Sequence, residues 1–113
     1  DVAGCDIFVK VAGGARVDDP AADLAILAAL ASSLREVPVP VDTLVLGEVG
    51  LTGEVRDVAD RASRLREAAR HGFARAVTAR TKRHRAKEEG LAVVAAASVE
   101  EAVALALARE GKP

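Results

Sequence analysis

The feature that most constrains the fold of this chain is the alternation of strand-like and helix-like segments along its 113 residues. Stretches rich in Val, Ile and Leu alternate with stretches in which apolar residues recur at helical spacing. Predicted strands cover residues 6–11, 43–46, 74–79 and 91–95, and predicted helices run from about 19 to 35, 60 to 71 and 98 to 109. This order predicts an α/β domain in two layers. The length suits one hydrophobic core, so we expect a single domain over residues 1–113.

Local signals predict where the helices begin and end. Asp19 is a plausible N-cap before Pro20 at the first helical position, and Gly72 is well placed to follow the second helix. Ser98 and Glu101 form a capping box that opens the last helix. In the first helix, apolar residues at helical spacing predict one continuous stripe: Leu24, Leu27, Leu30, Ala31 and Leu34.

Residues 47–56 contain three glycines and alternating apolar residues, a pattern typical of a tight hairpin. Glu48 lies between two of these glycines, and we expect it either to bond backbone within the hairpin or to reach a neighbouring subunit. Residues 80–90 are polar and basic, and they predict a loop or a short helix.

Composition excludes several kinds of site. Cys5 is the only cysteine, which rules out an internal disulfide or a cysteine-rich zinc site and favours a small buried side chain over a thiol nucleophile. The acids Asp18, Asp19 and Asp23 cluster at a helix N-terminus, where capping explains them better than a metal, so no metal site is expected. No run approaches the roughly 20 apolar residues of a membrane span, and no secretory signal is visible, so we expect a cytoplasmic protein without membrane contact.

The net charge of −1 conceals a strong asymmetry. Residues 60–87 hold ten Lys or Arg against two acids, so this segment carries +8 and the rest of the chain −9. The ten cations are Arg61, Arg64, Arg66, Arg70, Arg75, Arg80, Lys82, Arg83, Arg85 and Lys87. Such a segment indicates a surface that faces a polyanion, and the alternative is a solvated surface with scattered ion pairs. Because acids are scarce within the segment, we expect ion pairs inside it to leave its positive charge uncompensated.

Three stretches resemble the proteolytic domain of the Lon family: residues 19–23, 46–55 and 64–73. The resemblance implies a Lon proteolytic-domain-like (ribosomal protein S5 domain 2-like) fold, a mixed sheet with packed helices and one inserted hairpin. In that family a serine stands where this chain has Ala21, and a lysine where it has Arg64. An alanine offers no nucleophile, and a guanidinium cannot act as a base near neutral pH. The hydroxyls of Ser32, Ser33 and Ser63 do not match the family's serine position, so no catalytic residue is expected.

Other segments, at residues 22–25, 32–35, 47–51 and 68–73, resemble the C-terminal domain of the RadA (Sms) family of bacterial DNA repair proteins rather than true Lon. That resemblance implies a RecA-like ATPase core upstream, which uses ATP, and a zinc module before it. Neither is in this sequence, so we expect a C-terminal piece of a longer chain that needs no cofactor of its own. It also implies a homohexameric ring.

Together these observations predict a non-catalytic Lon-like domain of a RadA-type repair and recombination ATPase, which scaffolds a hexamer and binds double-stranded DNA. The sequence has no Asn or Gln to read bases and no aromatic platform for stacking, so phosphate contact without sequence specificity is expected. The predicted DNA-binding residues are Arg61, Arg64, Arg80, Lys82, Arg83, Arg85 and Lys87. Alternatives are a purely structural oligomerisation module and a pseudoprotease that binds peptides.

Overall fold

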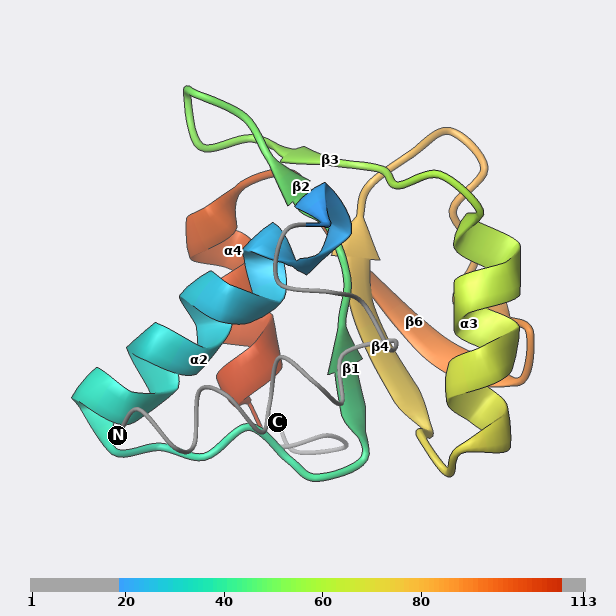
Figure 1. Cartoon of the computed structure of the whole chain (residues 1–113), viewed down its shortest axis with the longest axis horizontal. Coiled ribbons are helices and arrows are strands. Elements are labelled where there is room, and N and C mark those ends of the chain that lie inside the picture. Colours follow the sequence, from blue (N-terminus) through green and yellow to red (C-terminus); the bar gives the residue numbers. More distant parts are fainter. Residues whose placement is uncertain (1–18, 109–113) are drawn as a thin grey trace.

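The structure, a computed structural model, describes residues 19–108 (Figure 1). Its elements follow the predicted order: η1 (Pro20–Ala22), α2 (Asp23–Arg35), β1 (Thr43–Val45), β2 (Glu48–Val49), β3 (Val55–Arg56), α3 (Arg61–Arg70), β4 (Arg75–Ala79), β5 (Lys87–Glu88), β6 (Leu91–Ala96) and α4 (Val99–Leu107). The strand expected over residues 6–11, and the environment of Cys5, lie outside the described residues.

A mixed four-stranded sheet forms the centre of the domain, in the order β1-β4-β6-β5. β1, β4 and β6 run parallel, whereas β5 is antiparallel to β6. Strands β2 and β3 pair as the separate antiparallel hairpin that the glycine pattern predicted. The α/β class, the mixed sheet, the packed helices and the inserted hairpin are therefore confirmed.

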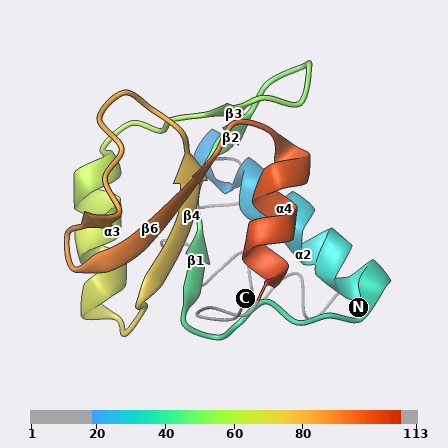
Figure 2. The same cartoon turned by 180° about the vertical axis from the view of Figure 1, so that it is seen from behind.

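Helices lie on both faces of the sheet. α2 and α4 lie side by side on one face, and α3 covers the other, as the front and back views both show (Figures 1 and 2). α3 belongs to the crossover between the parallel strands β1 and β4, and such crossovers place a helix against the sheet. α3 thus adds a helical layer beyond the two layers that the sequence predicted.

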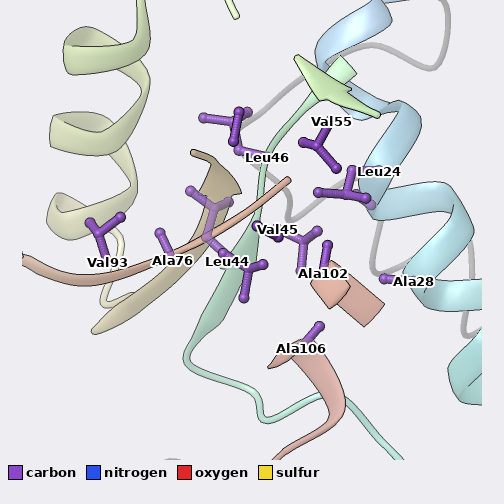
Figure 3. Close-up of a cluster of buried hydrophobic side chains, with 14 of the residues drawn as sticks. Leu24, Ala28, Leu44, Val45, Leu46, Val55, Ala76, Val93, Ala102 and Ala106 are labelled. Atoms are coloured by element: carbon purple, nitrogen blue, oxygen red, sulfur yellow. The ribbon is translucent and has the colours of Figure 1, made fainter. Parts of the chain in front are cut away.

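The core consists of small aliphatic side chains from both faces (Figure 3). Its largest fully buried apolar side chains are Leu24, Leu44, Leu46, Leu65, Leu91, Val45 and Val77. Many of its remaining members are alanines, and their small volume lets helices lie close to one another and to the sheet.

The predicted helix ends are confirmed. Asp19 Oδ1 accepts a hydrogen bond from the backbone N–H of Ala21 at 3.0 Å, and Ser98 Oγ accepts one from Glu101 N–H at 3.2 Å. Glu101 Oε1 reaches back to the N–H of Ala97 at 3.0 Å, one residue earlier than an ideal capping box requires. Gly72 has φ +96, the left-handed conformation that favours glycine just after a helix.

The apolar stripe predicted for the first helix is wrong as its buried face. Along α2 only Leu24 of the predicted stripe is fully buried, because the helix turns an alanine-rich face inward and leaves Leu27, Leu30 and Leu34 exposed. On α3 the buried residues are Leu65 and Ala68, and Ala62 is exposed. Residues 80–90 form a loop that ends in β5, not a helix.

Within residues 19–108, no helix is both long enough and apolar enough to cross a membrane. The same part of the chain holds no group of three His, Cys, Asp or Glu side chains placed to share a metal ion.

Candidate nucleic-acid interface

Ala21 and Arg64 lie at one location where η1, the base of the hairpin and α3 meet. Ala21 is buried at 4% exposure, and its carbonyl accepts a hydrogen bond from Gly47 N–H at 3.1 Å. Leu24 N–H donates back to Gly47 O at 3.0 Å, which ties the end of β1 to the start of α2. Arg64 projects from the first turn of α3 and is largely covered.

Asp19 joins these two positions through its two carboxylate oxygens. Oδ1 caps Ala21 N–H, and Oδ2 accepts from Arg64 Nη2 at 3.1 Å. Arg64 Nε also donates to the carbonyl of Ala59 at 2.9 Å. The location therefore holds a methyl group and a carboxylate bound to a guanidinium, and it has neither the hydroxyl nor the amine of a serine–lysine pair.

Ser32, Ser33 and Ser63 lie on α2 and α3. Ser32 donates to Val37 O at 2.6 Å near the end of α2, and Ser63 is exposed on α3.

Arg61, a predicted DNA contact, is turned inward and bound on several sides. Its Nε and Nη2 donate to the two carboxylate oxygens of Glu88 at 3.0 and 2.9 Å, and its Nη1 donates to Asp57 at 3.0 Å. A further bond runs from Nη2 to Thr78 Oγ1 at 2.9 Å. Burial opposes the charge, yet the bonds to Glu88 and Asp57 outweigh it and raise the pKa of Arg61. The guanidinium is thus committed to internal structure.

Other cations of the segment also have partners. Arg66 pairs with Glu89 at 3.1 Å, Arg70 with Glu67 at 3.3 Å, and Arg80 with Glu101 at 2.9 Å. Arg75 is buried and donates to the carbonyl of Leu105 at 2.7 Å and to Thr43 Oγ1 at 3.3 Å. Among the ten cations, ion pairing inside residues 60–87 joins only Arg70 to Glu67, as expected, but folding brings acids from outside the segment to four of them, Arg61, Arg64, Arg66 and Arg80.

Four predicted DNA contacts remain without an ion pair among the described residues: Lys82, Arg83, Arg85 and Lys87. All four are exposed. They lie in residues 81–87, which we call the basic loop; it follows the carboxyl end of β4 and leads into β5 (Figures 1 and 2). Two local hydrogen bonds shape the basic loop. The His84 N–H donates to the Thr81 carbonyl, and the Arg83 N–H donates to the side-chain Oγ1 of Thr81, both at 3.2 Å. Within residues 60–87, the exposed cations without an ion pair therefore all lie on one short loop.

Sequence reasoning missed Glu88, although it organises this region. Its carboxylate binds Arg61 and accepts Arg85 N–H at 3.2 Å, and the bonds from Arg61 are the main cause that lowers the pKa of Glu88. Arg61 and Glu88 are 27 residues apart, so no local pattern connects them. Glu48, whose role stayed open, is half-buried and lies opposite Arg56 in the hairpin register.

Comparison with known proteins decides the family. Residues 2–109 match the Lon protease (S16) C-terminal proteolytic domain. The chain belongs to this family. The Lon-like domain is also similar to proteins named DNA repair protein RadA, and the resemblance inferred from the motifs is confirmed. It is 47% identical to RadA of Pseudomonas aeruginosa over 98 residues, 87% of this chain and 22% of that protein.

RadA of Bacillus subtilis shares 44% identity with the Lon-like domain over 103 residues, 90% of this chain and 22% of that protein. For RadA of Escherichia coli the identity is 42% over 100 residues, 88% of this chain and 22% of that protein. The Lon-like domain thus spans about a fifth of the length of these relatives.

Proposed function

We propose that this Lon-like domain serves a DNA repair protein of the RadA type, without peptidase activity, and binds double-stranded DNA through phosphate contacts of the basic loop. The relatives are named as DNA repair proteins, which supports the biological setting. The observation that carries the proposal is that the cations of residues 60–87 divide into internally bound side chains and exposed, unpaired ones. Arg61, Arg64 and Arg75 are bound to internal partners, whereas Lys82, Arg83, Arg85 and Lys87 are exposed and unpaired within the described residues.

Like charges on one short loop repel one another, and a polyanion relieves that repulsion. Lysine and arginine bind phosphate oxygens well, and Arg does so with two parallel bonds. Of the seven residues predicted from sequence, the proposal retains these four as contacts, with Arg80 beside them paired to Glu101. Arg61 and Arg64 are given a structural role because their guanidinium groups already bind internal acceptors.

The absence of peptidase activity rests on the location that Asp19, Ala21 and Arg64 share. Serine–lysine hydrolysis needs a hydroxyl beside an amine that can accept its proton. Here Ala21 is a buried methyl group, and Arg64 keeps its proton beside the Asp19 carboxylate.

The test of DNA binding is a salt titration. The chain, mixed with two duplexes of unrelated sequence, should bind both with similar affinity. The slope of log affinity against log salt should fall between about −2 and −4, because each neutralised phosphate contributes roughly −0.9 and the basic loop offers four cations. No binding at low salt, or binding to one duplex alone, would overturn the proposal.

We further propose that the Lon-like domain is part of a homohexameric ring in a cytoplasmic protein, with a RecA-like ATPase core and a zinc module upstream. In support, Leu27, Leu30 and Leu34 form an exposed apolar row on α2 that subunit contact could cover. The same row favours the second candidate function, a purely structural oligomerisation module. A sizing column tests ring formation, and the salt titration separates the two functions, since a structural module shows no duplex binding.

A further inference from the structure

Glu88 lies where the basic loop ends and β5 begins, and its carboxylate connects the loop to α3. It accepts hydrogen bonds from Nε and Nη2 of Arg61 on α3, and Oε2 also accepts the backbone N–H of Arg85 from the loop. The side chain is only 16% exposed, so these charged bonds form away from bulk water and are stronger than surface ion pairs. One carboxylate therefore connects the backbone of Arg85 to α3.

His84, inside the same loop, has a ring nitrogen beside this carboxylate that makes no hydrogen bond to the described residues. Its Nδ1 is buried and has no hydrogen-bond partner among the described residues. The nearest acid oxygen is Oε2 of Glu88, at 3.7 Å, which is too long for a hydrogen bond. A neutral imidazole carries a hydrogen on one ring nitrogen only, whereas a protonated imidazole carries one on both, so protonation ensures that Nδ1 is a charged donor facing Glu88.

We propose that Glu88 positions the basic loop for DNA contact and that protonated His84 strengthens this hold, so that duplex binding tightens as pH falls. The inference rests on the proposed function. The charged groups around His84 are Glu88 on β5, Arg61 on α3 with its partner Asp57, and the loop's own cations. By linkage, DNA binding promotes proton uptake by His84 to the same extent.

For the variant Glu88→Gln, the positioning role of Glu88 and the change in net charge predict opposite effects on duplex affinity. Glu88→Gln adds one positive charge beside the loop, which alone would tighten duplex binding. Because the variant weakens the bonds that connect the basic loop to Arg61, we expect duplex affinity to fall about threefold or more. This is the scale of one lost charged hydrogen bond.

Glu89→Gln is the matched control, since it makes the same charge change at the neighbouring residue, whose carboxylate pairs with Arg66 outside the loop. Glu89→Gln should leave affinity unchanged or slightly tighter. Equal or tighter binding by Glu88→Gln in a folded chain would overturn the positioning role.

The two histidines of the chain test the proton-dependent part. Histidine ordinarily changes charge between about pH 5 and 8, so duplex affinity of the unmodified chain should rise about two- to fivefold across that range as pH falls. His84→Gln should remove this rise. His71→Gln should retain it, because His71 pairs with Glu67 near the far end of α3 (Figure 1).

A measurement without DNA separates failure of this inference from failure of the proposed function. In nuclear magnetic resonance spectra of the chain alone, the Hδ1 proton of His84 should become visible and protected from exchange at low pH, and Glu88→Gln should abolish it. If the unmodified chain binds no duplex, the proposed function fails. If it binds but His84→Gln keeps the full pH dependence, or Hδ1 stays unprotected, only this inference fails.

Discussion

Asp19 is the residue that determines what positions 21 and 64 can do. Its two oxygens bind the Ala21 backbone and the Arg64 guanidinium, so the helix start and α3 are joined by a fixed negative charge. A carboxylate next to a cationic side chain favours the protonated form of that side chain. The environment at position 64 thus suits a permanent cation and disfavours a base.

Replacing both residues by those of an active Lon dyad should therefore not restore hydrolysis. In the variant Ala21→Ser/Arg64→Lys, the new amine would lie near Asp19 and keep its proton, so it could not activate the hydroxyl. We expect no turnover of unstructured peptides above that of the unmodified chain. Measurable turnover that depends on the new serine would contradict this interpretation.

The lowered pKa of Glu54 predicts that the stability of the hairpin depends on pH. Hydrogen bonds from Thr52 are the largest cause that lowers its pKa to about 2, and Arg56 Nε and Nη2 add bonds at 3.0 and 2.8 Å. Because the pKa is lower in the folded chain, the stabilisation is fully present above about pH 4.5 and is lost as pH falls toward 2. A carboxyl titration by nuclear magnetic resonance should show a midpoint near 2. A midpoint near 4.5 would contradict the network.

At the scale of elements, α2 shows why a helix can be predicted while its buried face is not. Its start and its end are set by local features, and they were confirmed. Its inward face depends on what packs there, and α4 approaches closely because α2 presents Ala25, Ala28 and Ala29. The larger leucines remain outside, since the close contact between α2 and α4 leaves them no room.

The two faces of α2 should respond differently to substitution. Leu24→Ala removes a fully buried side chain and should lower the free energy of unfolding by about 2–5 kcal/mol. Leu34→Ser changes a side chain that is 86% exposed and should stay within about 0.5 kcal/mol. Urea denaturation followed by circular dichroism measures both. A large loss for Leu34→Ser would show that this face is covered in the isolated chain.

The hairpin and the basic loop mark the limits of prediction at this scale. Glycine spacing is a local signal, and it predicted β2 and β3. The charge balance of residues 60–87 was also local, and it left out the acids outside the segment that pair with its cations in the folded chain: Asp19, Asp57, Glu88, Glu89 and Glu101. No periodicity or composition identifies Glu88 as the partner of Arg61. Positions that depend on contacts across the sheet therefore needed the structure.

At the scale of the whole molecule, the parallel sheet gathers functional segments at one end. The hairpin follows β1 and the basic loop follows β4, and both lie beyond the carboxyl ends of these strands (Figures 1 and 2). Open α/β sheets commonly bind ligands at this edge. A chain with a net charge of −1 can thus present four exposed cations on one loop at this end, while Arg61, Arg64, Arg66, Arg70 and Arg80 of the same segment are paired with acids.

The most direct test of the account is charge reversal in the basic loop. Lys82→Glu/Arg83→Glu/Arg85→Glu should weaken duplex binding at least tenfold and make the salt slope shallower by roughly 2.7, or remove detectable binding, because three phosphate contacts are lost. The control Arg35→Glu/Arg66→Glu/Arg70→Glu makes the same charge change on exposed helix residues and should retain most of the affinity and the original slope. Unchanged binding by the loop variant, or equal losses in both variants, would contradict the assignment of DNA contact to the basic loop.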